Sequence, residues 1–116
     1  VSYAQVDFDP DLYIDTSNAI LDNINSEKRT NIISMSYHES YRTGSGFVSL
    51  PYTNDLDLIE FAKNREASFI IINERDLESW KYYESYTILD SLSPDVEKIY
   101  ESEDSGYLRQ IFKVKE

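Results

Sequence analysis

The chain has 116 residues, a length typical of one domain with one hydrophobic core, and its 22 Asp and Glu against 11 Lys and Arg leave a formal net charge of −11. Binding to nucleic acid or anionic lipid depends on a basic patch that neutralises phosphate, so this charge argues against either as the main partner. The lack of cysteine excludes disulfides and thiolate sites, and no apolar run reaches the roughly 20 residues that a membrane span needs.

The first predicted element is a helix that begins at Asp9-Pro10, because Pro is favoured at the first helical position after a cap residue. Apolar side chains then recur on one helical face: Tyr13, Ala19, Ile20 and Ile24, with Ile14 and Leu21 beside it. Polar and charged residues follow, and they predict that the helix ends near Asn25.

Two short strands are predicted next, separated by a polar segment. Residues 31–36 are typical of a buried strand, and residues 37–46 predict an ordered loop. A β-like pattern returns at residues 47–51, where Pro51 ends it because Pro cannot donate to a sheet ladder.

A second helix and a central strand follow. Asn54 or Asp55 can cap the helix, and residues 56–62 give it an apolar stripe beside charged positions. Ser68–Asn73 is a continuous apolar run rich in β-branched residues, which is typical of a strand covered on both faces.

Residues 77–92 mix aromatic with acidic side chains and predict one or two short helices. The aromatic cluster in this segment consists of Trp80, Tyr82, Tyr83 and Tyr86. Two interpretations stay open for it, namely packing in the core or an amphipathic surface that docks against another domain or the membrane interface.

The chain ends on a predicted antiparallel hairpin. Its two alternating segments are Val96–Tyr100 and Tyr107–Val114, joined by a loose turn over residues 101–106. Together with the alternation of strands and helices before it, this predicts an α/β fold of three layers: a mixed sheet with a parallel centre, helices on both faces, and a C-terminal antiparallel hairpin. We expect a single soluble domain over residues 1–116.

Acidic motifs do not predict a metal site. Carboxylates occupy alternate positions along Asp7–Asp11, as they do at the start of a calcium-binding loop. However, Leu12 and Asn18 occupy the positions at which an EF-hand needs Gly and Glu. Asp9-Pro10-Asp11 and Asp55-Leu56-Asp57 match the Asp-x-Asp pattern with which many nucleotide-sugar transferases hold a metal, yet helix capping and dipole effects account for such pairs. We predict no metal and no cofactor.

The only histidine, His38, is followed by Glu39 and Ser40. Nucleophilic catalysis requires Ser, His and an acid to converge in space, and consecutive residues point in different directions. We therefore predict no catalytic residue.

A candidate binding site lies in the polar segment after the first strand. Gly44-Ser45-Gly46 indicates a turn, since no Gly-rich phosphate fingerprint is completed. Tyr37, His38, Tyr41 and Arg42 flank this turn, and aromatic and hydrogen-bonding side chains beyond the end of a strand suit contact with a sugar or a headgroup. These four are the candidate substrate-binding residues.

The stretch Asn31–Asp76 resembles a pattern found after the last transmembrane helix of dolichyl-phosphate-mannose-type (family 39-like) glycosyltransferases. It has four steps: the strand Ile32–Ser36, the turn Tyr41–Gly44, the strand Val48–Tyr52, and the helix-strand unit Leu58–Arg75.

The resemblance implies an extracytoplasmic domain excised from a larger membrane protein, with the catalytic carboxylate in an early loop of the transmembrane part. We expect a non-catalytic accessory domain on the outer face of the cell membrane that helps to position the acceptor or a lipid-linked sugar donor. Its expected partners are the transmembrane part of the same polypeptide and a sugar or lipid-phosphate headgroup, with no nucleic acid. An independent extracytoplasmic binding or protein-interaction module is the alternative, and a free-standing hydrolase or transferase is the third.

Overall fold

The computed structural model describes residues 10–24, 30–77, 80, 83–104 and 106–115. Along the chain the elements are α1 (Pro10–Leu21), β1 (Asn31–Ser34), α2 (His38–Thr43), β2 (Gly46–Ser49), α3 (Asp55–Asn64), β3 (Phe69–Asn73), α4 (Glu74–Leu77), α5 (Tyr83–Tyr86), α6 (Leu89–Leu92), β4 (Val96–Asp104) and β5 (Tyr107–Val114). Within this described part, no helix combines the length and the apolar composition needed to cross a bilayer.

The strands form one mixed sheet in the order β2-β1-β3-β5-β4. β1 runs parallel to both β2 and β3, whereas β5 is antiparallel to β3 and to β4. The predicted mixed sheet with a parallel centre and a C-terminal antiparallel hairpin is therefore confirmed.

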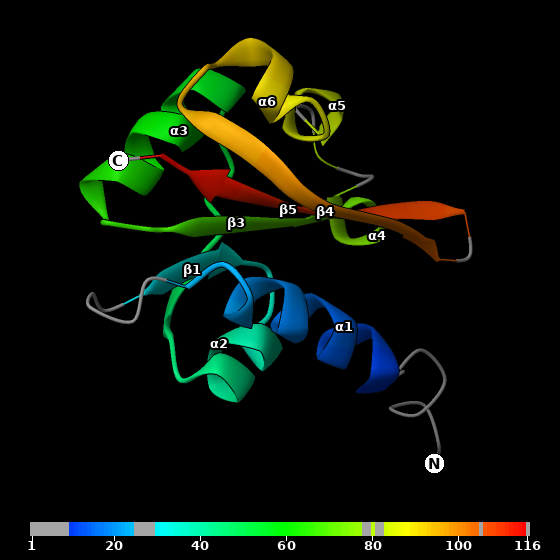
Figure 1. Cartoon of the computed structure of the whole chain (residues 1–116). Coiled ribbons are helices and arrows are strands. Elements are labelled where there is room, and N and C mark those ends of the chain that lie inside the picture. The colour runs from blue at the N-terminus through cyan, green and yellow to red at the C-terminus, as the bar shows by residue number, and fades with distance from the viewer. Residues whose placement is uncertain (1–9, 25–29, 78–79, 81–82, 105, 116) are drawn as a thin grey trace.

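Helices cover both faces of the sheet, as Figure 1 shows, with α1 and α2 on one side and α3, α5 and α6 on the other. On the α1 side, Ile20 packs with sheet residues into a cluster completed by Ile32, Phe69, Ile71 and Ile111. The opposite face holds a larger cluster that includes Leu58 of α3, Leu89 of α6 and Ile70 of β3. Full burial of each such side chain contributes about 1.5–3 kcal/mol, so the predicted three layers rest on two apolar interfaces.

β3 is the central strand, as the sequence predicts. Successive side chains point to opposite faces, so Phe69 and Ile71 face α1 while Ile70 and Ile72 face α3. All four are at most 4% exposed. A continuous apolar run is the expected composition for a strand that both layers cover.

The start of α3 is also confirmed. Asn54 precedes the helix, and its side-chain Oδ1 accepts a hydrogen bond of 2.9 Å from the backbone N–H of Asp57. This satisfies one of the amide groups that a helix N-terminus leaves without an intrahelical partner.

The ordered loop predicted over residues 37–46 is wrong, because residues 38–43 form helix α2. Thr43 donates from Oγ1 to the backbone oxygen of Glu39, and Gly44 ends the helix with a φ of 69°, a left-handed conformation that suits glycine. Glu39 and Ser40 are buried, so burial of one side of α2 stabilises a segment whose composition is polar.

Several strand boundaries also differ from the prediction. β1 ends at Ser34, not Ser36, and there the Ser34 hydroxyl accepts the backbone N–H of Ser36 in place of a ladder bond. β2 covers Gly46–Ser49, so it starts and ends earlier than predicted. β4 continues to Asp104, through most of the predicted turn, because its pairing with β5 continues to the end of the hairpin.

Candidate functional site

A polar hollow lies at the carboxyl ends of the parallel strands β1 and β3, on the side of the sheet that α1 and α2 cover. Its volume is about 10 Å³, room for about one water-sized group. The lining residues are Tyr13, Ser34, Met35, Ser36, Glu39, Ile71, Asn73, Asp76 and Arg109. After β1 the chain continues to β2 on one side, and after β3 it continues to the β4–β5 half of the sheet on the other side. The connections therefore diverge between β1 and β3, and open α/β sheets bind ligands at such a switch point.

Strand alternation directs three polar side chains into this hollow. Ser34 lies two residues after Ile32, and Asn73 two residues after Ile71, so each lies on the α1 side of the sheet. Arg109 is paired with Asn73 across the β3–β5 ladder and lies two residues before Ile111 on the same face. Where the apolar cluster on this face ends, polar residues follow.

A buried polar contact joins α1, α2 and β5 at the hollow. The guanidinium Nη2 of Arg109 lies 3.7 Å from Oε2 of Glu39, and these side chains are 4% and 2% exposed. Thr16 on α1 donates from Oγ1 to the same oxygen at 2.9 Å. The guanidinium also lies 5.7 Å from the ring centroid of Tyr13, within the range of a cation–π contact.

The other carboxylate at the hollow belongs to Asp76. Partial burial raises the pKa of Asp76, while the positive charges of Arg75 and Arg109 oppose that rise. Burial likewise raises the pKa of the Tyr13 hydroxyl, and the charges of Glu39 and Asp76 raise it further. Tyr13 therefore stays a neutral hydrogen-bonding group at physiological pH.

The four predicted site residues lie beside the hollow but do not line it. The His38 ring packs against Tyr13, with ring centroids 4.1 Å apart, and stacks with Tyr37 at 5.4 Å. Tyr37 is 62% exposed, so this row of rings leads from the hollow to the surface. Tyr41 is 82% exposed and Arg42 is exposed on the outer side of α2.

Sequence reasoning missed the residues that do form the hollow, above all Glu39 and Arg109. Two signals pointed to them. Arg109 interrupts an otherwise alternating strand at a position that faces the core, and charged side chains are almost never fully buried unless they are paired. Ser34 and Asn73 end neighbouring parallel strands, at the edge where ligands bind in such sheets.

The consecutive residues His38, Glu39 and Ser40 point to separate contacts. His38 contacts aromatic rings, Glu39 faces Arg109, and the Ser40 hydroxyl donates to the backbone oxygen of Gly46 at 3.4 Å. The described contacts of these three neighbouring side chains therefore lead to three different partners.

Of the acidic pairs, Asp9 lies outside the described residues and the side chain of Asp55 is not described. Oδ2 of Asp57 accepts the side-chain amide of Asn54 at 3.0 Å and the Thr53 hydroxyl at 3.4 Å, so it belongs to the cap of α3. Among the described residues, no three of the His, Cys, Asp and Glu side chains gather as metal ligands.

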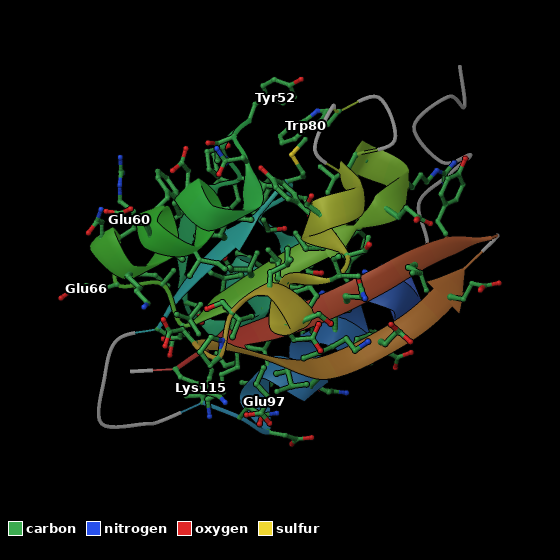
Figure 2. All side chains as sticks on the ribbon, turned by 90° about the horizontal axis from the view of Figure 1, so that it is seen from above. Tyr52, Glu60, Glu66, Trp80, Glu97 and Lys115 are labelled. Carbon is green, nitrogen blue, oxygen red and sulfur yellow. The ribbon has the colours of Figure 1, made fainter. Side chains whose placement is uncertain are left out.

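The aromatic cluster after β3 divides between core and surface. Tyr86 is fully buried, its single hydroxyl proton is shared between the backbone oxygens of Pro51 and Thr53, and its oxygen accepts the Thr53 N–H. Trp80 packs on the core and meets Tyr52 edge to face at 5.0 Å, and Figure 2 shows these two side chains together at the surface. Tyr82 lies outside the described residues.

Comparison of the chain with known protein families, with curated proteins and with solved structures finds no match.

Proposed function

We propose that this chain is a non-catalytic accessory domain of a membrane glycosyltransferase, held on the extracytoplasmic face of the cell membrane. In this proposal the transmembrane part of the same polypeptide carries out sugar transfer. The domain helps to position the acceptor or the lipid-linked sugar donor.

The observation that carries the proposal is the polar hollow at the carboxyl ends of β1 and β3. It offers carboxylate, guanidinium, amide and hydroxyl groups to a ligand, and a row of rings from Tyr13 to exposed Tyr37 leads to it. A few convergent polar groups beside aromatic side chains are typical of a small-molecule site. The small volume suits one projecting group of a larger ligand.

The segment that resembles the glycosyltransferase pattern supports the same assignment. It runs from Asn31 to Asp76, which covers β1 through most of α4. All but two of the lining residues, Tyr13 and Arg109, belong to it. The resemblance and the hollow therefore involve the same part of the chain.

Binding of the donor tests the proposal directly. The ¹⁵N-labelled chain is titrated in detergent micelles with a short-chain polyprenyl-phosphate sugar, and with the micelles alone as a control. We expect amide shifts at Ser36, Glu39 and Asn73 that saturate with the donor. The positioning role is contradicted if micelles alone cause the same amide shifts. It is also contradicted if neither the donor nor the acceptor causes any shift.

The membrane part of the proposal has its own test in the gene. We expect several hydrophobic segments of roughly 20 residues encoded upstream of Val1, with an acidic residue in the first extracytoplasmic loop. A soluble domain encoded there instead removes the glycosyltransferase assignment.

An independent extracytoplasmic interaction module is the second candidate. It is favoured by Tyr52, which is 59% exposed and contacts Trp80, because aromatic side chains are enriched at protein interfaces. This candidate is supported if a crosslinker at Tyr52 captures a soluble protein while neither the donor nor the acceptor shifts the amide signals of the chain. Glu60, exposed on α3, is a control position for the crosslinker.

A further inference from the structure

We propose that the hollow receives a hydroxyl group of an uncharged sugar, and that it selects against a phosphate. This inference rests on the proposed function, because it names the chemical class of the group bound at the same site. It follows from one buried oxygen, from the balance of charge around it and from the size of the hollow.

The buried oxygen is Oε1 of Glu39. Its partner Oε2 accepts from Thr16 and faces Arg109, whereas Oε1 is buried with no hydrogen-bond partner among the described residues. Glu39 is 1% exposed and lines the hollow. A carboxylate only accepts hydrogen bonds, and buried acceptors are almost always satisfied, so this oxygen calls for a donor placed in the hollow.

The charges at the hollow select a neutral donor. Two carboxylates, those of Glu39 and Asp76, disfavour an anion such as phosphate, and the formal net charge of −11 adds to this repulsion. The guanidinium of Arg109 already lies 3.7 Å from Oε2 of Glu39, so an ammonium group beside the same carboxylate would meet a like charge at close range. A hydroxyl is compatible with both the negative and the positive groups of the hollow, because it donates to a carboxylate and accepts from a guanidinium or an amide.

Size and aromatic side chains then favour a sugar. A volume of about 10 Å³ admits one hydroxyl, so the sugar ring stays at the mouth of the hollow. The row of rings that begins at Tyr13 in the lining and continues through His38 to largely exposed Tyr37 gives the sugar an aromatic surface to pack against. Further ring hydroxyls lie within the reach expected of Ser36 and Asn73, which line the same opening.

The test compares neutral methyl glycosides with inorganic phosphate on the full ¹⁵N-labelled chain. We expect gluco-, galacto- or manno-configured methyl glycosides to shift the amides of Ser36, Glu39 and Asn73 in a saturable manner, and phosphate at the same ionic strength to leave them unchanged. The inference is overturned if phosphate shifts these amides more strongly than the glycosides do, or if the glycosides do not bind. It is also overturned if ethylammonium shifts the amides and the glycosides do not.

Glu39→Gln tests the residue itself. The variant keeps the size of the side chain but places an amide at the hollow, so we expect glycoside affinity to fall by about tenfold, as for one lost hydrogen bond. Glu60→Gln is the matched control, because Glu60 is exposed on α3 across the sheet, and it should bind as the parent chain does. If Glu39→Gln loses the dispersed spectrum of the folded chain, Ser36→Ala and Asn73→Ala carry the same comparison, and unchanged affinity in both overturns the inference.

The outcome separates this inference from the proposed function. If a lipid-linked donor binds with equal affinity to the parent chain and to Glu39→Gln, the sugar is not read at this hollow, but the accessory role stands. If neither the glycosides nor the donor binds anywhere on the chain, both proposals fail.

Discussion

The side chain of Arg109 on β5 faces that of Glu39 on α2 at 3.7 Å, although the two residues lie far apart in the sequence, and both side chains are almost completely buried. Removal of one partner leaves the other charge buried without compensation. We expect Glu39→Ala to lower the free energy of unfolding by about 3–5 kcal/mol. Chemical denaturation measures this change.

The exposed pair Lys63–Asp95 is the control for that measurement, because its side chains are 46% and 48% exposed. We expect Asp95→Ala to cost at most about 1 kcal/mol. Equal losses for Glu39→Ala and Asp95→Ala contradict the buried role of the Arg109 contact.

Ile71 lies in the central strand and is 4% exposed. Truncation creates a cavity between the sheet and α1, so Ile71→Ala should lower the free energy of unfolding by about 2–5 kcal/mol. Glu103 on β4 is exposed and should tolerate alanine. Similar denaturation midpoints for the two variants contradict the placement of β3 between two layers.

The Tyr86 hydroxyl ties α5 to the segment after β2 through the backbone of Pro51 and Thr53. Tyr86→Phe leaves these backbone groups without that partner, and we expect a loss of about 1–3 kcal/mol. Tyr41→Phe removes a hydroxyl from a side chain that is 82% exposed and should be near neutral. A thermal or chemical denaturation curve for each variant decides the comparison.

Asp76 predicts a pH dependence with a definite sign. Because burial raises its pKa in the folded chain, the folded state holds this proton more tightly than the unfolded state does. Stability should therefore fall as pH rises through the interval from the unfolded pKa to the folded pKa, and Asp76→Asn should remove this part of the slope.

The Asp76 pKa is measured directly by NMR titration of its carboxyl carbon. Arg75→Gln removes a charge that lowers the pKa, so the titration should move further upward in that variant. A pKa at or below the ordinary value of aspartate contradicts the partial burial of this carboxyl.

We also expect no glycosyl-transfer or hydrolytic turnover by the isolated chain. The described contacts of His38, Glu39 and Ser40 lead to different partners, whereas an activated nucleophile needs a base in contact with it. Incubation with a lipid-linked sugar and an acceptor, followed by product analysis, checks this. Turnover that Asp55→Ala or Asp9→Ala abolishes overturns the non-catalytic role.

Local patterns were sufficient for several elements. The start of α1 at Pro10, the cap of α3 at Asn54 and the central strand β3 depend on signals within a few residues, namely a fixed φ, a side-chain acceptor and an unbroken apolar run. Patterns of this kind also sufficed for the layer architecture, since alternating helices and strands have few ways to bury their apolar faces.

Other features depend on contacts that no local window contains. Residues 38–43 have a polar composition, and they form a helix where Glu39 and Ser40 become buried. The sequence predicts the hairpin turn too early in the chain, because β4 keeps pairing with β5 through an acidic stretch.

The sequence by itself determined the fold class and the central strand, because apolar periodicity and helix capping act over a few residues. Only the tertiary structure decided which side chains line the hollow. Thr16, Glu39 and Arg109 are brought together from α1, α2 and β5, and each is buried only because the other elements cover it. A polar group becomes a candidate ligand contact when packing removes water from it, and packing is a property of the whole chain.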